Sequence, residues 1–167
     1  MAEPEYWLRG RIDGIAPLLQ PVAHSLLQAR EDVAAALSRT PVEHVWVSPH
    51  GAASIGFHVK HLCGSLDRLL SYARGEALTA AQLAYLQTES APGTPPADAA
   101  VLIALVDEAV GRALRQLRGT SAATLTEARA VGRQQLPSTV IGLLVHAAEH
   151  TTRHAGQIIT TAKIVAA

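Results

Sequence analysis

Apolar residues recur at intervals of three and four along four long stretches of the chain, the spacing that places them on one face of an α-helix. The stretches run from Pro17 or Pro21 to Leu37, from Ser54 to Arg74, from Ala99 to about Leu117, and from Leu136–Pro137–Ser138 to the end of the chain. Glycines at positions 75 and 119 follow two of these stretches, as glycine often does at the end of a helix. The pattern therefore predicts four long amphipathic helices.

The segments between these stretches carry the signals of loops and of one short additional helix. Thr79 and Gln82 match a capping box, so we expect a helix from there to about Thr88. Residues 90–97 contain three prolines and a glycine and are predicted to be a loop. Residues 41–52 are interpreted as a connection in which Trp46 and its valine neighbours form a short extended piece. Residues 120–136 are interpreted as irregular.

Four amphipathic helices with modest connections predict an all-α fold, with an antiparallel four-helix bundle as the default architecture. The connection between the second and third long helices is the longest, and it permits a crossover instead of a simple up-and-down order. The composition agrees, because the residues are 49% hydrophobic but only 4% aromatic, and alanine and leucine favour helices. We expect the 167 residues to form one domain, covering residues 1–167.

Charge and composition argue against several functional classes. The 14 Lys and Arg residues are balanced by 14 Asp and Glu residues, without a basic cluster, so nucleic-acid binding is not expected. Apolar runs stay well short of the roughly 18 residues of a membrane span, and the first residues lack the pattern of a signal peptide. A single cysteine, Cys63, cannot form an internal disulfide. We therefore expect a cytoplasmic protein that does not bind a membrane.

Histidine is the residue type that suggests chemistry. His146, His150 and His154 follow one another at four-residue spacing on the last predicted helix, which aligns their imidazoles along one side and is a metal-binding spacing. His146 and His154 are roughly 12 Å apart along the helix axis, so a single ion can take only an adjacent pair. His154 lies nearest to the apolar stripe, His150 next and His146 furthest from it. The predicted pair is therefore His150 and His154.

A third imidazole is expected from the second long helix, where His58 and His61 lie beside the apolar stripe. Periodicity does not choose between them, although His58 is slightly nearer to the stripe. Three imidazole ligands leave a fourth position on the ion for water or substrate, which is typical of catalytic rather than structural zinc sites. Such an ion lowers the pKa of bound water toward about 7, or holds a thiol as its thiolate.

Other candidate groups have simpler interpretations. His146, Glu149 and His150 match the H-x-x-E-H pattern of inverzincin peptidases, in which the glutamate is the general base. Since His146 points furthest from the interior, we favour a simpler interpretation, in which Glu149 is a solvated helix residue or pairs with Arg153, four residues further on. Cys63 lies about 200° around the helix from His61 and is predicted to be a small buried side chain.

The chain resembles the DinB-like (YfiT-like) family of metalloenzymes over most of its length. The resemblance is clearest in Trp7–Gly10, in Ser54–Gly75 and in His146–Gln157. The family pattern has one histidine on the second helix and an H-x-x-x-H pair, followed by Gly-Gln, on the last.

Carried over to this chain, the family pattern implies a metal triad of His61, His150 and His154. The choice of His61 over His58 comes from this resemblance, because His61 stands fourteen residues before Gly75, as the family's ligand does. Many members have His-His-Arg-Gly-Gln at the positions where this chain has Arg-His-Ala-Gly-Gln (residues 153–157), so a second histidine and an arginine are replaced.

The resemblance also implies a cofactor, partners and a class of reaction. The family binds a divalent metal ion, with zinc and nickel the first candidates, and often forms a homodimer. Some members resemble S-transferases or isomerases that use a low-molecular-weight thiol. We therefore expect a metal-dependent hydrolase or thiol transferase acting on a small-molecule substrate. The alternative is a non-catalytic, stress-associated protein whose metal ion only staples the helices.

Overall fold

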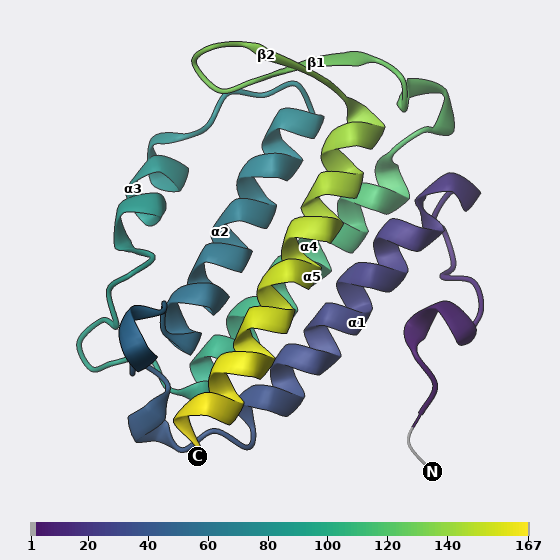
Figure 1. The fold of residues 1–167 in the computed structure, drawn as a ribbon. Coiled ribbons are helices and arrows are strands. Elements are labelled where there is room, and N and C mark those ends of the chain that lie inside the picture. The colour runs from purple at the N-terminus through teal and green to yellow at the C-terminus, as the bar shows by residue number, and fades with distance from the viewer. Residues whose placement is uncertain (1–2, 167) are drawn as a thin grey trace.

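The computed structural model describes residues 3–166, which are mainly helical (Figure 1). The long helices are α1 (Gln20–Leu37), α2 (Ile55–Ala73), α4 (Ala99–Gly119) and α5 (Val140–Val165), and α3 (Ala80–Thr88) is a short one. Two short strands, β1 (Ala128–Val131) and β2 (Leu136–Thr139), form an antiparallel hairpin. Single 3₁₀ turns lie in the connections, at Tyr6–Leu8, Pro17–Leu19, Val42–His44, Pro49–Gly51 and Ala122–Thr124.

The four long helices form a bundle in which α1 and α2 each pack against both α4 and α5. Figure 1 shows α1 and α5 running in one direction and α2 and α4 running in the other. The chain therefore passes between two parallel neighbours, α2 and α4, by a return segment outside the bundle that contains α3. The predicted all-α fold is confirmed. The long connection is the crossover that the sequence permitted, so the helices do not follow a simple up-and-down order.

Side-chain caps fix the starts of several helices. Ser54, Asp98 and Thr139 each accept a hydrogen bond from the backbone N–H three residues further on, at the starts of α2, α4 and α5. Thr79 and Gln82 form the predicted capping box at the start of α3, with both reciprocal bonds present. These local signals explain why the starts of α2, α3 and α4 could be predicted closely.

The interpretation of residues 120–136 as irregular was wrong, because part of this segment pairs as the β1–β2 hairpin. Pro137 lies in β2 and not in a first helical turn, so α5 begins later than predicted, at Val140. Each strand has four residues and lacks a clear alternation of apolar and polar side chains. A long-range contact helps to hold the hairpin, since Arg129 donates from Nε to the carbonyl of Ala73 at 2.9 Å.

Trp46 lies between 3₁₀ turns and not in an extended piece, which corrects the interpretation of residues 41–52. Its ring lies against Gly56, where an added Cβ would come within 2.6 Å of the ring atoms. Its indole N–H donates to the carbonyl of Ala97 at 2.8 Å. The side chain therefore links the chain just before α2 to the chain just before α4, and a larger residue than glycine at position 56 would push it away.

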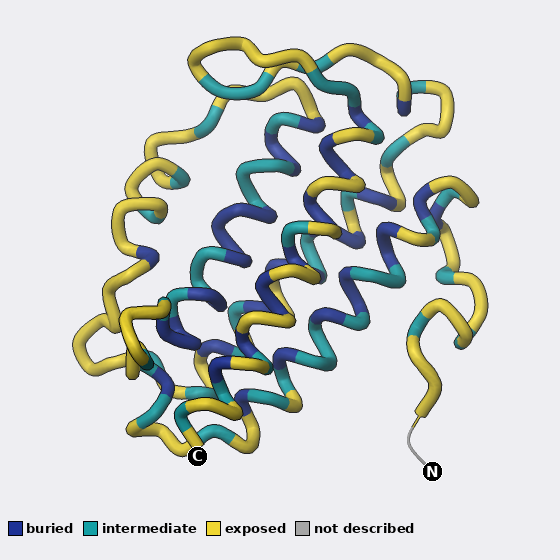
Figure 2. Tube along the Cα trace, viewed as in Figure 1, coloured by how far each residue is buried: buried dark blue, intermediate teal, exposed yellow. Residues whose placement is uncertain are grey.

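The core runs between the four long helices, as the buried residues in Figure 2 show. In contrast, α3 and the hairpin are mostly exposed (Figure 2), and the residues of α3 include none that is buried. The large side chains that are almost fully buried include Leu26, Leu62, Leu66, Leu102, Leu117, Leu144 and Ile158. Across residues 3–166, the helices are too short or too polar to cross a bilayer.

Candidate metal centre

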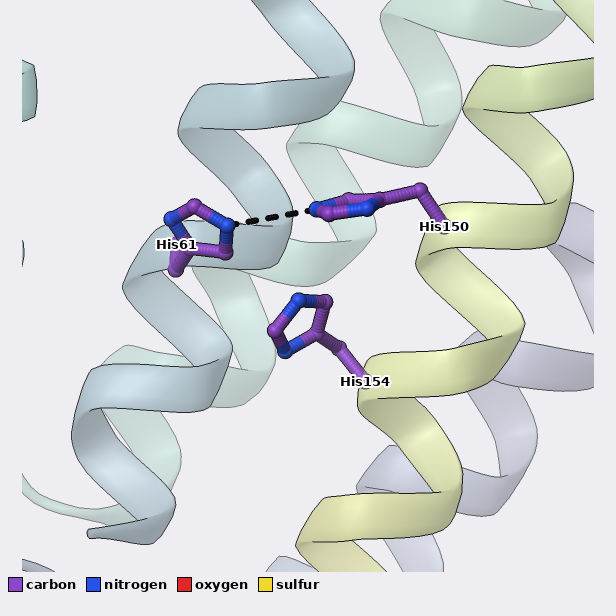
Figure 3. Close-up of side chains that lie close together, drawn as sticks. All are labelled: His61, His150 and His154. Atoms are coloured by element: carbon purple, nitrogen blue, oxygen red, sulfur yellow. Dashed lines mark hydrogen bonds between the residues drawn. The ribbon is translucent and has the colours of Figure 1, made fainter. Parts of the chain in front are cut away.

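Three imidazoles converge where α2 packs against α5. His61 extends from α2, and His150 and His154 extend from successive turns of α5 (Figure 3). Each ring offers one nitrogen, and these three atoms all lie within 4.8 Å of one another. Nε2 of His61 lies 3.2 Å from Nε2 of His150, and the ring centroids of His61 and His154 are 4.7 Å apart. These are the three residues that the resemblance named as a metal triad.

The spacing of these nitrogens fits a first-row divalent ion. Imidazole nitrogens bound at about 2.0–2.1 Å in tetrahedral geometry lie roughly 3.4 Å from one another. The distance between Nε2 of His61 and Nε2 of His150 is 3.2 Å, close to this value. The nitrogen of His154 lies within 4.8 Å of both, so the three atoms are close enough to share one ion. Within residues 3–166 the cluster supplies three ligands, so a tetrahedral ion keeps one position open.

The second ring nitrogen of His61 is held by Glu89. Nδ1 of His61 lies 2.7 Å from Oε2 of this carboxylate, which is 3% exposed. Arg68 donates to the other oxygen, Oε1, at 2.7 Å and balances the buried charge. Because a carboxylate only accepts, the proton is on Nδ1 of His61, and the lone pair of Nε2 faces His150. Phe57 stacks on the ring of His61 and covers it.

The second ring nitrogen of His154 is held by His58. Their Nδ1 atoms lie 3.1 Å apart, and both residues are buried. Burial, followed by the neighbouring imidazoles, lowers the pKa of His154 to about 4. Burial also lowers the pKa values of His58 and His150. These rings are therefore neutral near pH 7, which is the form that binds metal.

His58 and His61 differ in their positions relative to His154, which bears on the choice that the sequence left open. His61 belongs to the group of three nitrogens that can share an ion, whereas His58 contacts His154 from another side. With the bridging proton on Nδ1 of His154, the free lone pair of that ring is on Nε2. The ring of His61 thus faces the nitrogens of His150 and His154, and His58 is placed to orient the ring of His154.

His146 and Glu149 do not take part in the cluster. The side chain of His146 is half exposed, and its Nδ1 lies 3.3 Å from Oε2 of Glu149, three residues further along α5. Glu149 also pairs with Arg153, the i+4 partner that the sequence predicted. The carboxylate is therefore turned toward an exposed ion pair, and the geometry does not support the inverzincin hypothesis.

Cys63 is buried, as predicted. Burial raises the pKa of its thiol to about 12, so the thiol stays protonated near pH 7. It lines a cavity of about 90 Å³ together with Arg68, Gln82 and Tyr85, on the side of α2 that faces α3 and α4. A protonated thiol is a poor nucleophile, so any thiol chemistry at the histidines has to use a thiol from solution.

Glu89 and its contacts with His61 and Arg68 were not predicted from the sequence. Glu89 stands 28 positions from His61 and directly follows α3, so no helical spacing links the two residues. One signal was present within α2, because His61, Gly64 and Arg68 follow at three and four residues and therefore share a face. A glycine between two polar residues on one face marks a place where another segment comes close.

Comparison with known proteins agrees with this architecture. A solved structure of a conserved protein from Enterococcus faecalis has a TM-score of 0.72 over 89% of this chain and 96% of that chain, at 19% sequence identity. At this identity the match shows a common fold. Curated proteins gave no match. The family model of the DinB superfamily matches residues 25–158, which include parts of all four long helices and all three clustered histidines. The chain therefore belongs to the DinB superfamily.

Proposed function

We propose that the protein is a metal-dependent enzyme in which His61, His150 and His154 hold a divalent cation such as zinc or nickel. We further propose that it catalyses either a hydrolysis or the transfer of a low-molecular-weight thiol. The observation that carries this proposal is the convergence of three imidazole nitrogens within 4.8 Å, in a cluster that supplies three ligands. Three-ligand sites with an open position are typical of catalytic zinc.

The chemistry of such a centre follows from the open position: a bound divalent ion acts as a Lewis acid that makes water or a thiol nucleophilic near neutral pH. The protein's own residues hold the proposed ligand imidazoles in the tautomer and orientation that bind a metal ion. Glu89 holds the proton of His61 on Nδ1, and His58 bonds Nδ1 of His154, so both Nε2 atoms can act as ligands. Phe57 stacks on one face of His61.

Metal content tests the ligand set. The untagged protein should bind one ion per chain, and His150→Ala and His154→Ala should each lose most of it, as measured by elemental analysis after dialysis. His146→Ala is the matched control, because it removes an exposed histidine at the same spacing on the same helix. It should bind as much metal as the wild type. Equal metal content in all four proteins would rule out this ligand assignment.

A turnover assay tests the reaction. The protein, metal-loaded and metal-free, should be assayed with simple esters and amides, and with thiol cosubstrates and an electrophilic partner. Turnover that requires the metal would identify the class. If thiols leave the absorption spectrum of the cobalt-substituted protein unchanged and no substrate turns over, the enzymatic proposal fails.

A second function is a non-catalytic metal staple, with His58 as the neighbouring imidazole. Nδ1 of His58 is 3.1 Å from Nδ1 of His154, so closing the site requires His58 to move to the Nε2 side of that ring as a fourth ligand. A closed four-ligand site stabilises a fold without binding substrate. The cobalt spectrum distinguishes the two, because an added thiol changes the spectrum of an open site and leaves that of a closed one unchanged.

A further inference from the structure

Glu89 is an unusual residue in this structure. Within residues 3–166 the buried polar side chains are hydroxyl groups, imidazoles and this one carboxylate. It directly follows α3, whose nine residues include none that is buried. Burying a carboxylate is costly unless the charge is paired and hydrogen-bonded. A helix that adds nothing to the core therefore delivers a buried charge to the edge of the histidine cluster.

One face of α2 is shaped to receive this carboxylate. Its Oε2 lies 2.7 Å from Nδ1 of His61, and its Oε1 lies 2.7 Å from Nη1 of Arg68. Gly64 lies between these two residues on the same face, and an added Cβ there would come within 2.3 Å of Oε1 of Glu89. Each oxygen thus has its own partner, and the glycine provides the space.

The chain around Glu89 is fixed to α2 on both sides. Lys60 donates from Nζ to the carbonyls of Thr88 and Ala91, which flank Glu89. About two helical turns earlier, Gln82 donates from Nε2 to Oδ2 of Asp67 at 2.6 Å. These bonds hold the backbone of the return segment against α2, so the position of the carboxylate is set by the segment as a whole.

We propose that Glu89 is a positioning residue for the metal centre, and that it couples the docking of residues 79–91 to metal binding. The proposal rests on the proposed role of His61 as a ligand. A carboxylate that accepts from Nδ1–H fixes the tautomer and orientation of the imidazole and makes Nε2 a stronger ligand. Because coupling between two equilibria is reciprocal, an ion bound at Nε2 also strengthens the bond from His61 to Glu89 and holds the segment more tightly.

Metal affinity tests the positioning role. Zinc binding is measured by competition with a chelator for the wild type, Glu89→Gln, Gly64→Ala and the control Glu149→Gln. Glu89→Gln should weaken binding about 10-fold to 100-fold, the usual effect of losing such a partner. Gly64→Ala should weaken it similarly, because the new Cβ displaces the carboxylate. Alanine favours helix over glycine, so this loss would not come from a weaker α2.

Glu149→Gln is the matched control. It removes a negative charge next to His150 in sequence, but Glu149 bonds Arg153 and His146 and not a proposed ligand. Its zinc affinity should stay within about threefold of the wild type. A loss as large as that of Glu89→Gln would show that general electrostatics, and not positioning, sets the affinity, and would overturn the proposal.

The wild-type protein provides a test that does not depend on the folding of a variant. Amide hydrogen exchange in residues 79–91 should slow at least severalfold when zinc is added, with a smaller change in the hairpin. If zinc binds and neither this exchange nor the affinity of Glu89→Gln changes, the role of Glu89 is disproved while the metal centre stands. If the wild type does not bind zinc or nickel, the proposed function itself fails, which the titration shows directly.

Discussion

The two sides of the histidine cluster are held in different ways. His61 bonds a buried carboxylate that arrives from outside the bundle and is balanced by Arg68. His154 bonds His58, a neutral imidazole on the neighbouring helix of the bundle. The first side is an ionic unit of His61, Glu89 and Arg68, in which the carboxylate contacts both of the other side chains. The second is a single hydrogen bond between groups that the core already positions. The difference indicates that the first side is costlier to disrupt.

The largest effect is expected from breaking the ionic unit. Arg68→Met leaves the carboxylate of Glu89 buried without its charge partner, and we expect a loss of about 3 kcal/mol in the free energy of unfolding. Urea denaturation of the metal-free protein measures it. Adding Glu89→Gln to this variant should restore much of the loss. Wild-type stability in the single variant would show that the ionic unit does not matter for folding.

A change of pH tests the second side of the cluster, formed by His154 and His58. The pKa of His154 lies at about 4 in the folded protein, below its ordinary value of 6.5, so the unfolded chain binds the proton more tightly. The contribution of His154 to the free energy of unfolding is therefore fully present above pH 6.5 and is lost as the pH falls toward 4. Between pH 7.5 and pH 5 the metal-free protein should lose roughly 2 kcal/mol of stability. His154→Gln should flatten this dependence, and an equally steep profile in that variant would contradict the assignment.

Replacing the neutral partner itself should have a smaller effect on folding. His58→Leu removes one buried hydrogen bond and leaves an apolar side chain of similar size, so the free energy of unfolding should change by about 1 kcal/mol. Metal affinity should nevertheless fall about tenfold, because His154 loses the group that orients it. Thermal denaturation and zinc titration measure the two quantities. Unchanged affinity would show that the bundle alone orients His154.

The smallest effect is expected from the exposed pair on α5. Glu149 and Arg153 are both largely exposed, and surface ion pairs contribute little to stability. Glu149→Gln should therefore leave the melting temperature unchanged within error. A clear shift would mean that the exposed face of α5 is involved in contacts that the isolated chain does not show.

Periodicity and caps explain how much of the fold could be predicted. The stripes of apolar residues gave the four long helices, and Thr79 with Gln82 gave the start of α3. These signals are local, so one sequence contains them in full. The hairpin was missed because its strands are short and are held in part by Arg129 from a distance. Likewise, the direction of α4 depends on how the return segment packs and not on any local pattern.

The candidate site could be predicted only where its residues share a helix. His150 and His154 are four residues apart, and helical spacing alone aligns them on α5. The preference for His61 over His58 came from the family resemblance. Glu89 could not be identified, because its role depends on a tertiary contact across the return segment. Gly64 was a signal in the sequence, but the need for a glycine at this position is explained only by the carboxylate of Glu89, which approaches it in the fold.

The parallel arrangement of α2 and α4 has a consequence for how such a protein can change. Two parallel helices that follow one another need a connecting segment that runs back in the opposite direction. Here this segment runs along the flank of α2, beside the histidine cluster (Figure 1). Since Ala80–Thr88 include no buried residue, most of their side chains can be exchanged at little cost to the core, apart from Gln82 and Tyr85, which bond α2. The fold thus has an exchangeable wall next to the histidine cluster, whose surface can change while the scaffold stays the same.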